Sequence, residues 1–386
     1  MSTSRSGVEQ PAARLDYGAA MSDQSAPARL SLQLTADPTP EARRAEILAA
    51  PGFGLHFTDH MVLVEWTPEH GWHAGRLQAY GPLSLDPATA VLHYAQEIFE
   101  GLKAYAHDDG SVWTFRPEAN ATRMQRSADR LALPRLPVDM FLEAVDTLVT
   151  IDRAWVPYGG ETSLYLRPFM FASEAFLGVR PARHVTFCVI ASPAGAYFPG
   201  GVRPVSIWLS ENHARAGRGG TGAAKTGGNY ASSLLPQQEA IAAGCDQVAF
   251  LDAVEHKWVE ELGGMNLCFV YADGHIVTPE LSGTILEGVT RDSVLAIAAD
   301  LGLKVEERRV AASEWRDGVA SGEITEVFAC GTAAVVTPIG MLRWDGGEVG
   351  HGFDTTGEVT AAVRSRLLDL QYGRADDPYG WLHRIC

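Results

Sequence analysis

The stretch "GRGGTGAAKTGGNYASSL", residues 217–234, places six glycines around a single lysine, Lys225, and runs into a predicted helix that starts near Tyr230. Glycine-rich loops serve three kinds of site. They bind the phosphates of nucleotides, they bind dinucleotides, or they surround a lysine that reacts covalently. The choice among these chemistries decides the fold and the function that we expect for the chain.

Both nucleotide-binding patterns match this stretch poorly. Residues 217–222 satisfy GxGxxG, but a dinucleotide fingerprint directly follows a strand and opens a helix. Here the segment "ENHARA" (211–216) separates the pattern from the preceding predicted strand. The phosphate loop of nucleoside triphosphatases requires GxxxxGK[ST], and Ala224 occupies the position of its last glycine. Close approach to phosphate needs that glycine, so both interpretations are disfavoured.

The composition makes Lys225 unusual. Of the 31 Lys and Arg residues only four are lysines, at positions 103, 225, 257 and 304. An ordinary surface loop of this chain would therefore carry arginine as its cation. Unlike arginine, lysine can lose its proton at accessible pH and attack a carbonyl group. The composition favours covalent chemistry, although the spacing alone also allows a solvated surface loop.

Length and composition indicate a globular chain of two domains. The 386 residues are 46% hydrophobic and 20% charged, which is enough apolar material for a large core. The formal net charge of −16 argues against nucleic acid as a partner, because phosphate backbones require a basic face. No apolar run is long enough to cross a bilayer, so we expect no membrane partner.

The cysteines and histidines indicate a reducing compartment without a metal site. The five cysteines are scattered and lack CxxC spacing, which is typical of cytoplasmic proteins. The segment "HFTDH" (56–60) spaces two histidines four residues apart, but it lacks the glutamate of a zinc-protease helix. We therefore expect a cytoplasmic location and no metal.

Changes in composition predict the boundaries of the domains. Residues 1–30 are small and polar, and we expect a disordered leader over 1–45, with Met21 as an alternative start. The segment "PAGAYFPGGVRP" (193–204) is rich in proline and glycine and predicts an interdomain linker at 195–208. The predicted domains are therefore 46–194 and 209–386.

Hydrophobic periodicity predicts strands and helices that do not strictly alternate. A short helix or turn should lead into a strand over 92–105, and Asn120 is a candidate cap for the helix that follows. The predicted helices cover 116–134, 137–157, 290–303 and 359–373, and the main strands cover 57–66, 163–171, 184–192, 205–210, 247–252 and 266–271. Residues 325–339 are predicted as a strand, a turn at Gly331 and another strand. This mixture predicts an α/β chain of two domains and not one doubly wound sheet.

The glycine-rich stretch resembles the cofactor-lysine segment of branched-chain amino-acid aminotransferases, which are fold-type-IV enzymes that use pyridoxal 5′-phosphate. Similarity to this family spans residues 50–385 and includes eight further segments in the same order: "FTDHMVLVEW", "LHYAQEIFEGLKAY", "FRPEANATRMQRSADRL", "SLYLRPFMF", "ELGGMNL", "LSGTILEGVTRDS", "CGTAAVVTPIG" and "LQYG". The resemblance implies a smaller N-terminal α/β domain and a larger C-terminal domain, with the cofactor between them.

The resemblance implies a cofactor site. Lys225 matches the family lysine that forms the Schiff base and shuttles the Cα proton. Glu261 matches the carboxylate that pairs with the pyridine nitrogen, and the neighbouring Glu260 is its rival. Tyr230 matches the tyrosine that bonds the phenolic oxygen of the cofactor. The residues that match the phosphate site are Arg123, Val289, Thr290 and Thr332.

The resemblance also implies a substrate site. The amides of Thr332 and Ala333 would hold the substrate carboxylate, Arg167 would help admit the γ-carboxylate of glutamate, and Arg215 would brace the lysine loop. Five aromatic residues would line an apolar pocket that selects leucine, isoleucine and valine: Phe53, Tyr94, Phe99, Tyr165 and Tyr197.

The implied activity is a reversible ping-pong transfer of the amino group between Leu, Ile or Val and 2-oxoglutarate, which gives branched 2-oxo acids and L-glutamate. Alternatives on the same fold are a D-amino-acid or aromatic aminotransferase and an aminodeoxychorismate lyase, and a third hypothesis is a non-enzymatic protein that has kept the fold. Family members are at least homodimers, so we expect a homodimer. Residues 334–337 lack the CxxC of some animal members, and no redox switch is expected there.

Overall fold

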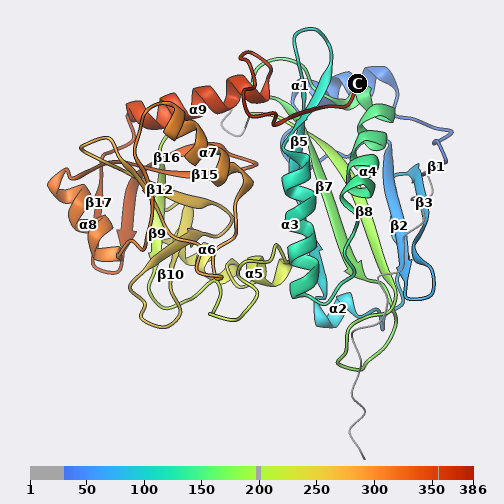
Figure 1. The fold of residues 1–386 in the computed structure, drawn as a ribbon, viewed down its shortest axis with the longest axis horizontal. Helices are drawn as coiled ribbons and strands as arrows, with labels where there is room; N and C mark the ends of the chain where they lie inside the picture. The colour runs from blue at the N-terminus through green and yellow to red at the C-terminus, as the bar shows by residue number, and fades with distance from the viewer. Residues whose placement is uncertain (1–29, 197–200, 355) are drawn as a thin grey trace, which may run out of the picture.

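The computed structural model describes residues 30–196, 201–354 and 356–386, which form two halves that lie side by side (Figure 1). Each half is built around a nine-stranded mixed sheet flanked by helices. The prediction of a two-domain α/β chain is confirmed. Among the helices of the described ranges, none has both the length and the apolar character that a membrane span requires.

The first sheet contains the strands of the first half of the chain and the last strand. Its order is β1-β3-β2-β8-β7-β5-β6-β18, with β4 paired to β7, and only the β1–β3 pair is parallel. Its strands are β1 (Ser31–Leu32), β2 (His60–Thr67), β3 (Gly71–Ala79), β4 (Glu97–Phe99), β5 (Leu102–Ala106), β6 (Val112–Phe115), β7 (Ser163–Ala172), β8 (Val185–Ala194) and β18 (Leu382–Arg384).

Two long helices pack on this sheet (Figure 1). α4 (Val138–Ile151) contacts β2 and β8 and buries Phe141, Val145 and Leu148, which recur at helical spacing. α3 (Pro117–Arg130) packs against α4 and β4, and this contact leaves part of α3 facing the second half. The other helical elements of this half are α1 (Glu41–Ala49), α2 (Val91–Tyr94) and the 3₁₀ turn Arg153–Trp155.

The second sheet has the order β11-β10-β9-β16-β15-β12-β13-β14, with β17 paired to β16. Its strands are β9 (Val205–Ser210), β10 (Gln247–Leu251), β11 (Val259–Leu262), β12 (Asn266–Tyr271), β13 (Ile276–Thr278), β14 (Val305–Glu307), β15 (Ile324–Gly331), β16 (Val335–Trp344) and β17 (Gly347–Gly350). The helices of this half are α5 (Gly227–Ala231), α6 (Leu234–Ala242), α7 (Val289–Asp300), α8 (Ala312–Ser321) and α9 (Glu358–Gln371).

Both faces of the second sheet are buried. Along β12, Leu267 and Phe269 belong to the apolar cluster that includes α8, while Cys268 and Val270 belong to the cluster that includes α7 and α9. Alternate side chains of a strand point to opposite faces, so every position of this strand must be apolar or paired. This double burial explains the continuous apolar run that predicts the strand.

The structure corrects the predicted boundaries at three points. Disorder up to residue 45 is wrong for residues 30–45, because β1 pairs with β3 and α1 begins at Glu41. The linker is shorter than predicted, because β9 begins at Val205. The chain does not end in the second half, since β18 returns to the first sheet and pairs with β6. Pairing between strands so far apart in the chain cannot be predicted from the local sequence.

Candidate active site

A cavity of about 220 Å³ lies between the two halves and is lined by side chains from both. It brings together twelve residues that the sequence predicts for the cofactor and the substrate: Phe53, Phe99, Arg123, Tyr165, Arg167, Lys225, Tyr230, Glu261, Val289, Thr290, Thr332 and Ala333. A cavity with one lysine, one buried carboxylate and several amide donors is suited to a small anionic ligand with a reactive carbonyl group.

The part of the loop that carries Lys225 is held by hydrogen bonds. The Lys225 N–H donates to Ser127 Oγ at 2.9 Å, and the Lys225 carbonyl accepts from the Phe99 N–H at 2.9 Å. Asn229 Nδ2 donates to the carbonyl of Ala224 at 2.8 Å. These contacts tie the loop to the first half and to α5, so the alternative of a solvated surface loop does not apply to Lys225.

Close packing explains one of the glycines of the loop. A Cβ atom at Gly222 would overlap the backbone of Thr284, with its carbonyl oxygen as the nearest atom. Only glycine lets the two backbones approach so closely. The glycine therefore serves the packing of the loop against the segment before α7, and no nucleotide site is needed to account for it.

The amine of Lys225 points into the cavity beside an aromatic pair. Its Nζ donates to Tyr230 Oη at 2.6 Å and lies 4.6 Å from the ring centroid of Phe99. Burial lowers the pKa of Lys225 to about 8, and the nearby Arg123 guanidinium acts in the same direction. Burial raises the pKa of Tyr230 to about 12, so the phenol keeps its proton at neutral pH. The amine is therefore set to act as a nucleophile or a base.

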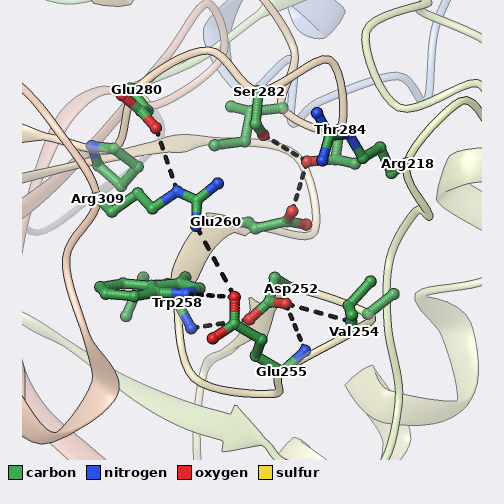
Figure 2. A pocket seen from close by; sticks show the side chains of 14 residues that line it. Arg218, Asp252, Val254, Glu255, Trp258, Glu260, Glu280, Ser282, Thr284 and Arg309 are labelled. Carbon is green, nitrogen blue, oxygen red and sulfur yellow. Dashed lines mark hydrogen bonds and ion pairs between the residues drawn. The ribbon is translucent and has the colours of Figure 1, made fainter.

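Glu260 and Glu261 are neighbours on β11, where successive side chains point to opposite faces of the sheet. Glu261 lines the cavity together with Lys225. Glu260 lines a different cavity, shown in Figure 2, where it accepts a hydrogen bond from the Thr284 hydroxyl. The two carboxylates therefore face different surroundings, and only Glu261 can contact a ligand that also reaches the lysine.

Buried donors surround Glu261. Its Oε1 accepts from the Leu286 N–H at 2.8 Å and pairs with Arg215 Nη1 at 2.9 Å. Burial raises the pKa of Glu261 to about 7, although the Arg215 charge and the Leu286 N–H oppose this effect. Arg215 also donates to the carbonyls of Thr284 at 3.0 Å and Gly222 at 3.4 Å, so it connects Glu261 to the lysine loop. A cationic group bound beside Glu261 would favour its ionised form.

The start of α7 offers amide donors to the cavity. Val289 and Thr290 line the cavity and are the first residues of the helix, whose leading N–H groups have no acceptor inside the helix. A Cβ atom at Gly288 would overlap Asn266 Oδ1, so this start requires glycine. A helix N-terminus of this kind favours an anion through its free donors and its dipole.

Arg123 reaches the cavity from α3 as part of a buried ion pair. Its Nε and Nη2 donate to the two carboxylate oxygens of Glu100 at 2.8 and 2.7 Å, and its Nη1 donates to the Glu287 carbonyl at 3.1 Å. Burial alone would raise the pKa of Glu100, but the Arg123 guanidinium keeps it below its ordinary value. A guanidinium has five N–H donors, so two remain for an anion in the cavity.

The structure corrects the role predicted for Asn120. Arg116 is the residue at the N-cap of α3, and Asn120 is buried inside the helix, where its Nδ2 donates to Glu100 Oε2 at 2.8 Å. Asn120 and Glu100 thus support Arg123. Glu100 is not among the residues predicted from the sequence, and an acid inside the apolar segment "EIFEGL" is the signal that could have identified it.

Aromatic side chains and Arg167 line another part of the cavity. The rings of Phe53 and Tyr165 meet edge to face at 5.0 Å. Arg167 Nη2 donates to Tyr165 Oη at 2.9 Å, and its guanidinium lies over the Phe99 ring at 4.7 Å. The Nε of Arg167 is buried, and no described residue accepts from it. A buried donor without a partner in this lining fits a ligand with an acceptor group.

One predicted substrate residue, Tyr94, is not part of this lining, and another falls outside the described residues. Tyr94, at the end of α2, is 41% exposed and donates from its hydroxyl to the Leu177 carbonyl at 2.7 Å. It does not line the cavity of its own chain, because this bond holds it on the outside of the first half. The prediction for Tyr94 is therefore not supported within one chain. Tyr197 lies outside the described residues.

His60, one of the two histidines at 56–60, has a structural role. His60 Nδ1 is 2.7 Å from Asp152 Oδ1, and its Nε2 accepts from the Thr35 N–H at 3.0 Å. This arrangement tethers the N-terminal segment to the first half. Within the ranges that the structure describes, no group of three or more His, Cys, Asp or Glu side chains could hold a metal ion.

Comparison with known proteins identifies the family of the chain. Residues 97–341 match the model of the family described as amino-transferase class IV. The chain therefore belongs to the amino-transferase class IV family. The chain is 62% identical over 358 residues to a probable branched-chain-amino-acid aminotransferase of Streptomyces coelicolor. This match covers 92% of this chain and 99% of the relative. The chain is 53% identical over 365 residues to the branched-chain-amino-acid aminotransferase of Mycolicibacterium smegmatis, over 94% of this chain and 99% of the relative.

Solved structures share the fold. The crystal structure of the Escherichia coli branched-chain amino acid aminotransferase matches with a TM-score of 0.70 at 27% identity and covers 85% of this chain and 99% of that chain. The branched-chain amino acid aminotransferase of T.th., solved with pyridoxamine 5′-phosphate, matches with a TM-score of 0.68 at 32% identity, over 84% and 98% of the two chains. The predicted fold class is thereby confirmed.

Proposed function

We propose that this chain is a branched-chain-amino-acid aminotransferase, which transfers the amino group between Leu, Ile or Val and 2-oxoglutarate in a reversible ping-pong reaction. The observation that carries the proposal is the joint presence of Lys225, Tyr230 and Glu261 in one buried cavity. Relatives of 62% and 53% identity with the branched-chain name support it. None of the relatives described above is a D-amino-acid aminotransferase, an aromatic aminotransferase or a lyase, so these alternatives are not favoured.

The residues of the cavity fit pyridoxal 5′-phosphate as the cofactor. Its ring nitrogen would meet Glu261, its phenolic oxygen Tyr230, its phosphate the start of α7 with Arg123, and its aldehyde Lys225. The buried acceptor and the free amides of the cavity support this fit. When bound, this group supplies an electron sink for a carbanion at the substrate Cα. Structures of the T.th. enzyme contain pyridoxamine 5′-phosphate and N-(5′-phosphopyridoxyl)-L-glutamate.

Lys225 moves the proton in this reaction. Its Nζ takes the proton from the Cα atom of the amino acid and returns it when the reaction runs in reverse. A base works best when its pKa lies near the operating pH, and burial brings the pKa of Lys225 to about 8. The hydroxyl of Tyr230, 2.6 Å from Nζ, orients the amine.

The turn at 332–334 binds the substrate carboxylate. Thr332 and Ala333 line the cavity, and no backbone carbonyl of the described chain accepts from the N–H groups of Thr332, Ala333 or Ala334. Successive free amides make a concave site for an anion. The aromatic lining takes the apolar side chain, and Arg167 takes the γ-carboxylate of glutamate in the other half-reaction.

The absorbance spectrum of the purified protein tests the proposal. With the cofactor bound, leucine should bleach the visible band, and 2-oxoglutarate should then restore it. A band that ignores leucine but responds to D-alanine or an aromatic amino acid would overturn the substrate class. If no band forms after incubation with pyridoxal phosphate, the cofactor assignment fails.

The rate at which the cofactor-free protein takes up pyridoxal phosphate should rise with pH and level off above about pH 8. The lysine must be neutral to attack the aldehyde, and burial lowers the pKa of Lys225 from 10.5 to about 8. Stopped-flow measurement of the visible band between about pH 6 and 10 checks this profile. A rate that still climbs near pH 10 would contradict the lowered pKa, and a Lys257→Ala variant should keep the wild-type profile.

Two parts of the proposal have other grounds: the oligomeric state rests on the family resemblance, and the location rests on the scattered cysteines. We predict a homodimer and a cytoplasmic location. Sedimentation of the purified protein tests the first, and fractionation of the cells that produce it tests the second.

A further inference from the structure

Lys103 is a buried lysine that the proposed reaction does not use. It lies on β5 in the first half, and only 8% of the residue is exposed. Its Nζ reaches across to the second half and donates to the carbonyl oxygen of Ala333 at 2.9 Å. This carbonyl is the only acceptor within hydrogen-bond distance that the described part of the chain offers to Nζ.

The turn that Lys103 contacts is strained. It joins β15 to β16, and Val335 closes it with a φ of 61°. This left-handed conformation is unfavourable for a β-branched residue and persists only where neighbouring groups hold it. Arg364 of α9 holds the far end of the turn, because its Nε donates to the Val336 carbonyl at 3.2 Å. Lys103 and Arg364 thus hold carbonyl groups on either side of Val335.

The positive charge of Lys103 is costly where it lies. The carboxylate of Glu161 is already bonded to Arg364 Nη1 at 2.9 Å and to its Nη2 at 2.5 Å. Burial lowers the pKa of Lys103 to about 8; Glu161 opposes this shift and Arg364 adds to it. An apolar side chain of the same length would avoid the desolvation penalty, so packing alone does not explain a lysine here.

We propose that Lys103 is a positioning residue for the substrate carboxylate. It holds the turn at 332–334 in its strained form and adds a positive charge behind the amides that bind the anion. The inference rests on the proposed function, which assigns the carboxylate to these amides. A cation beside a peptide group in a water-poor site strengthens the attraction of the neighbouring N–H groups for an anion. The contact also connects the two halves at the edge of the cavity.

The test replaces Lys103 by methionine in the cofactor-loaded enzyme. Lys103→Met should keep the visible band and a kcat within about threefold of wild type, while KM for leucine and the Kd of 4-methylvaleric acid rise about 10-fold or more. This acid has the side chain and carboxylate of leucine but no amine. Lys103→Arg should recover most of the affinity, because it keeps a cation. The control Lys304→Met removes a lysine whose side chain is 73% exposed and should change neither constant.

A second substrate separates a carboxylate effect from a general loss of structure. 3-Methylbutylamine is leucine without its carboxylate, and its single-turnover reaction should be equally fast in Lys103→Met and in wild type. An equal loss with leucine and with this amine would overturn the proposal, and so would an unchanged Kd for 4-methylvaleric acid.

If Lys103→Met does not fold, Lys103→Gln tests the role of the Lys103 charge instead. It keeps a hydrogen-bond donor but no charge, so the affinity for 4-methylvaleric acid should still fall, and wild-type affinity would overturn the role of the charge. Failure of the proposed function looks different, because the wild-type band would then not respond to leucine at all.

Discussion

Replacement of Lys225 by alanine should lower kcat/KM for leucine and 2-oxoglutarate by at least about 10⁴-fold, because one amine both attaches the cofactor and moves the proton. No other described lysine can take over this role. Lys103, the other buried lysine, is bonded to the Ala333 carbonyl. Lys257 and Lys304 do not line the cavity. The side chains around the cavity are otherwise retained, so the variant should still fold.

Steady-state assays and spectra of Lys225→Ala check this expectation. The visible band should be missing or unresponsive to leucine. Added methylamine should restore part of the activity, because a small amine fits the space that the lysine side chain leaves and can carry the proton. Lys257→Ala is the matched control and should behave as wild type. Activity within about tenfold of wild type in Lys225→Ala would refute the assigned chemistry.

Buried strands of largely apolar sequence could be predicted, and a buried strand that carries acids could not. The run at 205–210 coincides with β9, and that at 266–271 with β12, because apolar residues dominate both runs. β11 was not predicted, since "VEEL" places two acids in a buried strand. Arg215 and Thr284 satisfy these acids from segments distant in the chain. The local sequence does not indicate which distant residues will pair with these acids.

The residues of the site are also predictable only where a local motif contains them. Lys225 and Tyr230 lie five residues apart in one loop, so a local motif predicts both. The partners of Arg123 cannot be derived in this way, because Glu100 gains its role only when α3 packs beside β4. Lys103 and Ala333 are 230 positions apart and meet only after the two halves have docked. Groups that support a site through tertiary contact thus become visible only in the folded chain.

Glu261→Gln should lower kcat for leucine by about 10²–10³-fold and leave the cofactor bound. A neutral amide cannot stabilise a protonated ring nitrogen, so the bound cofactor becomes a weaker electron sink. The change also leaves the buried Arg215, 2.9 Å from Glu261 Oε1, without its counter-charge. We therefore expect some loss of stability as well, because an unpaired buried charge is unfavourable. Single-turnover bleaching by leucine, measured beside thermal unfolding, separates the two effects.

The neighbouring carboxylate provides the control. Glu260 is buried on the same strand but faces the other cavity (Figure 2), and Glu260→Gln should keep kcat within about threefold, because an amide oxygen still accepts from the Thr284 hydroxyl. Equal losses of kcat in both variants would mean that β11 is destabilised. A larger loss of kcat in Glu260→Gln would assign the contact with the ring nitrogen to Glu260 instead of Glu261. A cofactor analogue with carbon in place of the ring nitrogen probes the same contact from the ligand side. It should slow the wild type about as much as Glu261→Gln does, and it should slow Glu261→Gln little further, because coupled changes to one interaction are not additive.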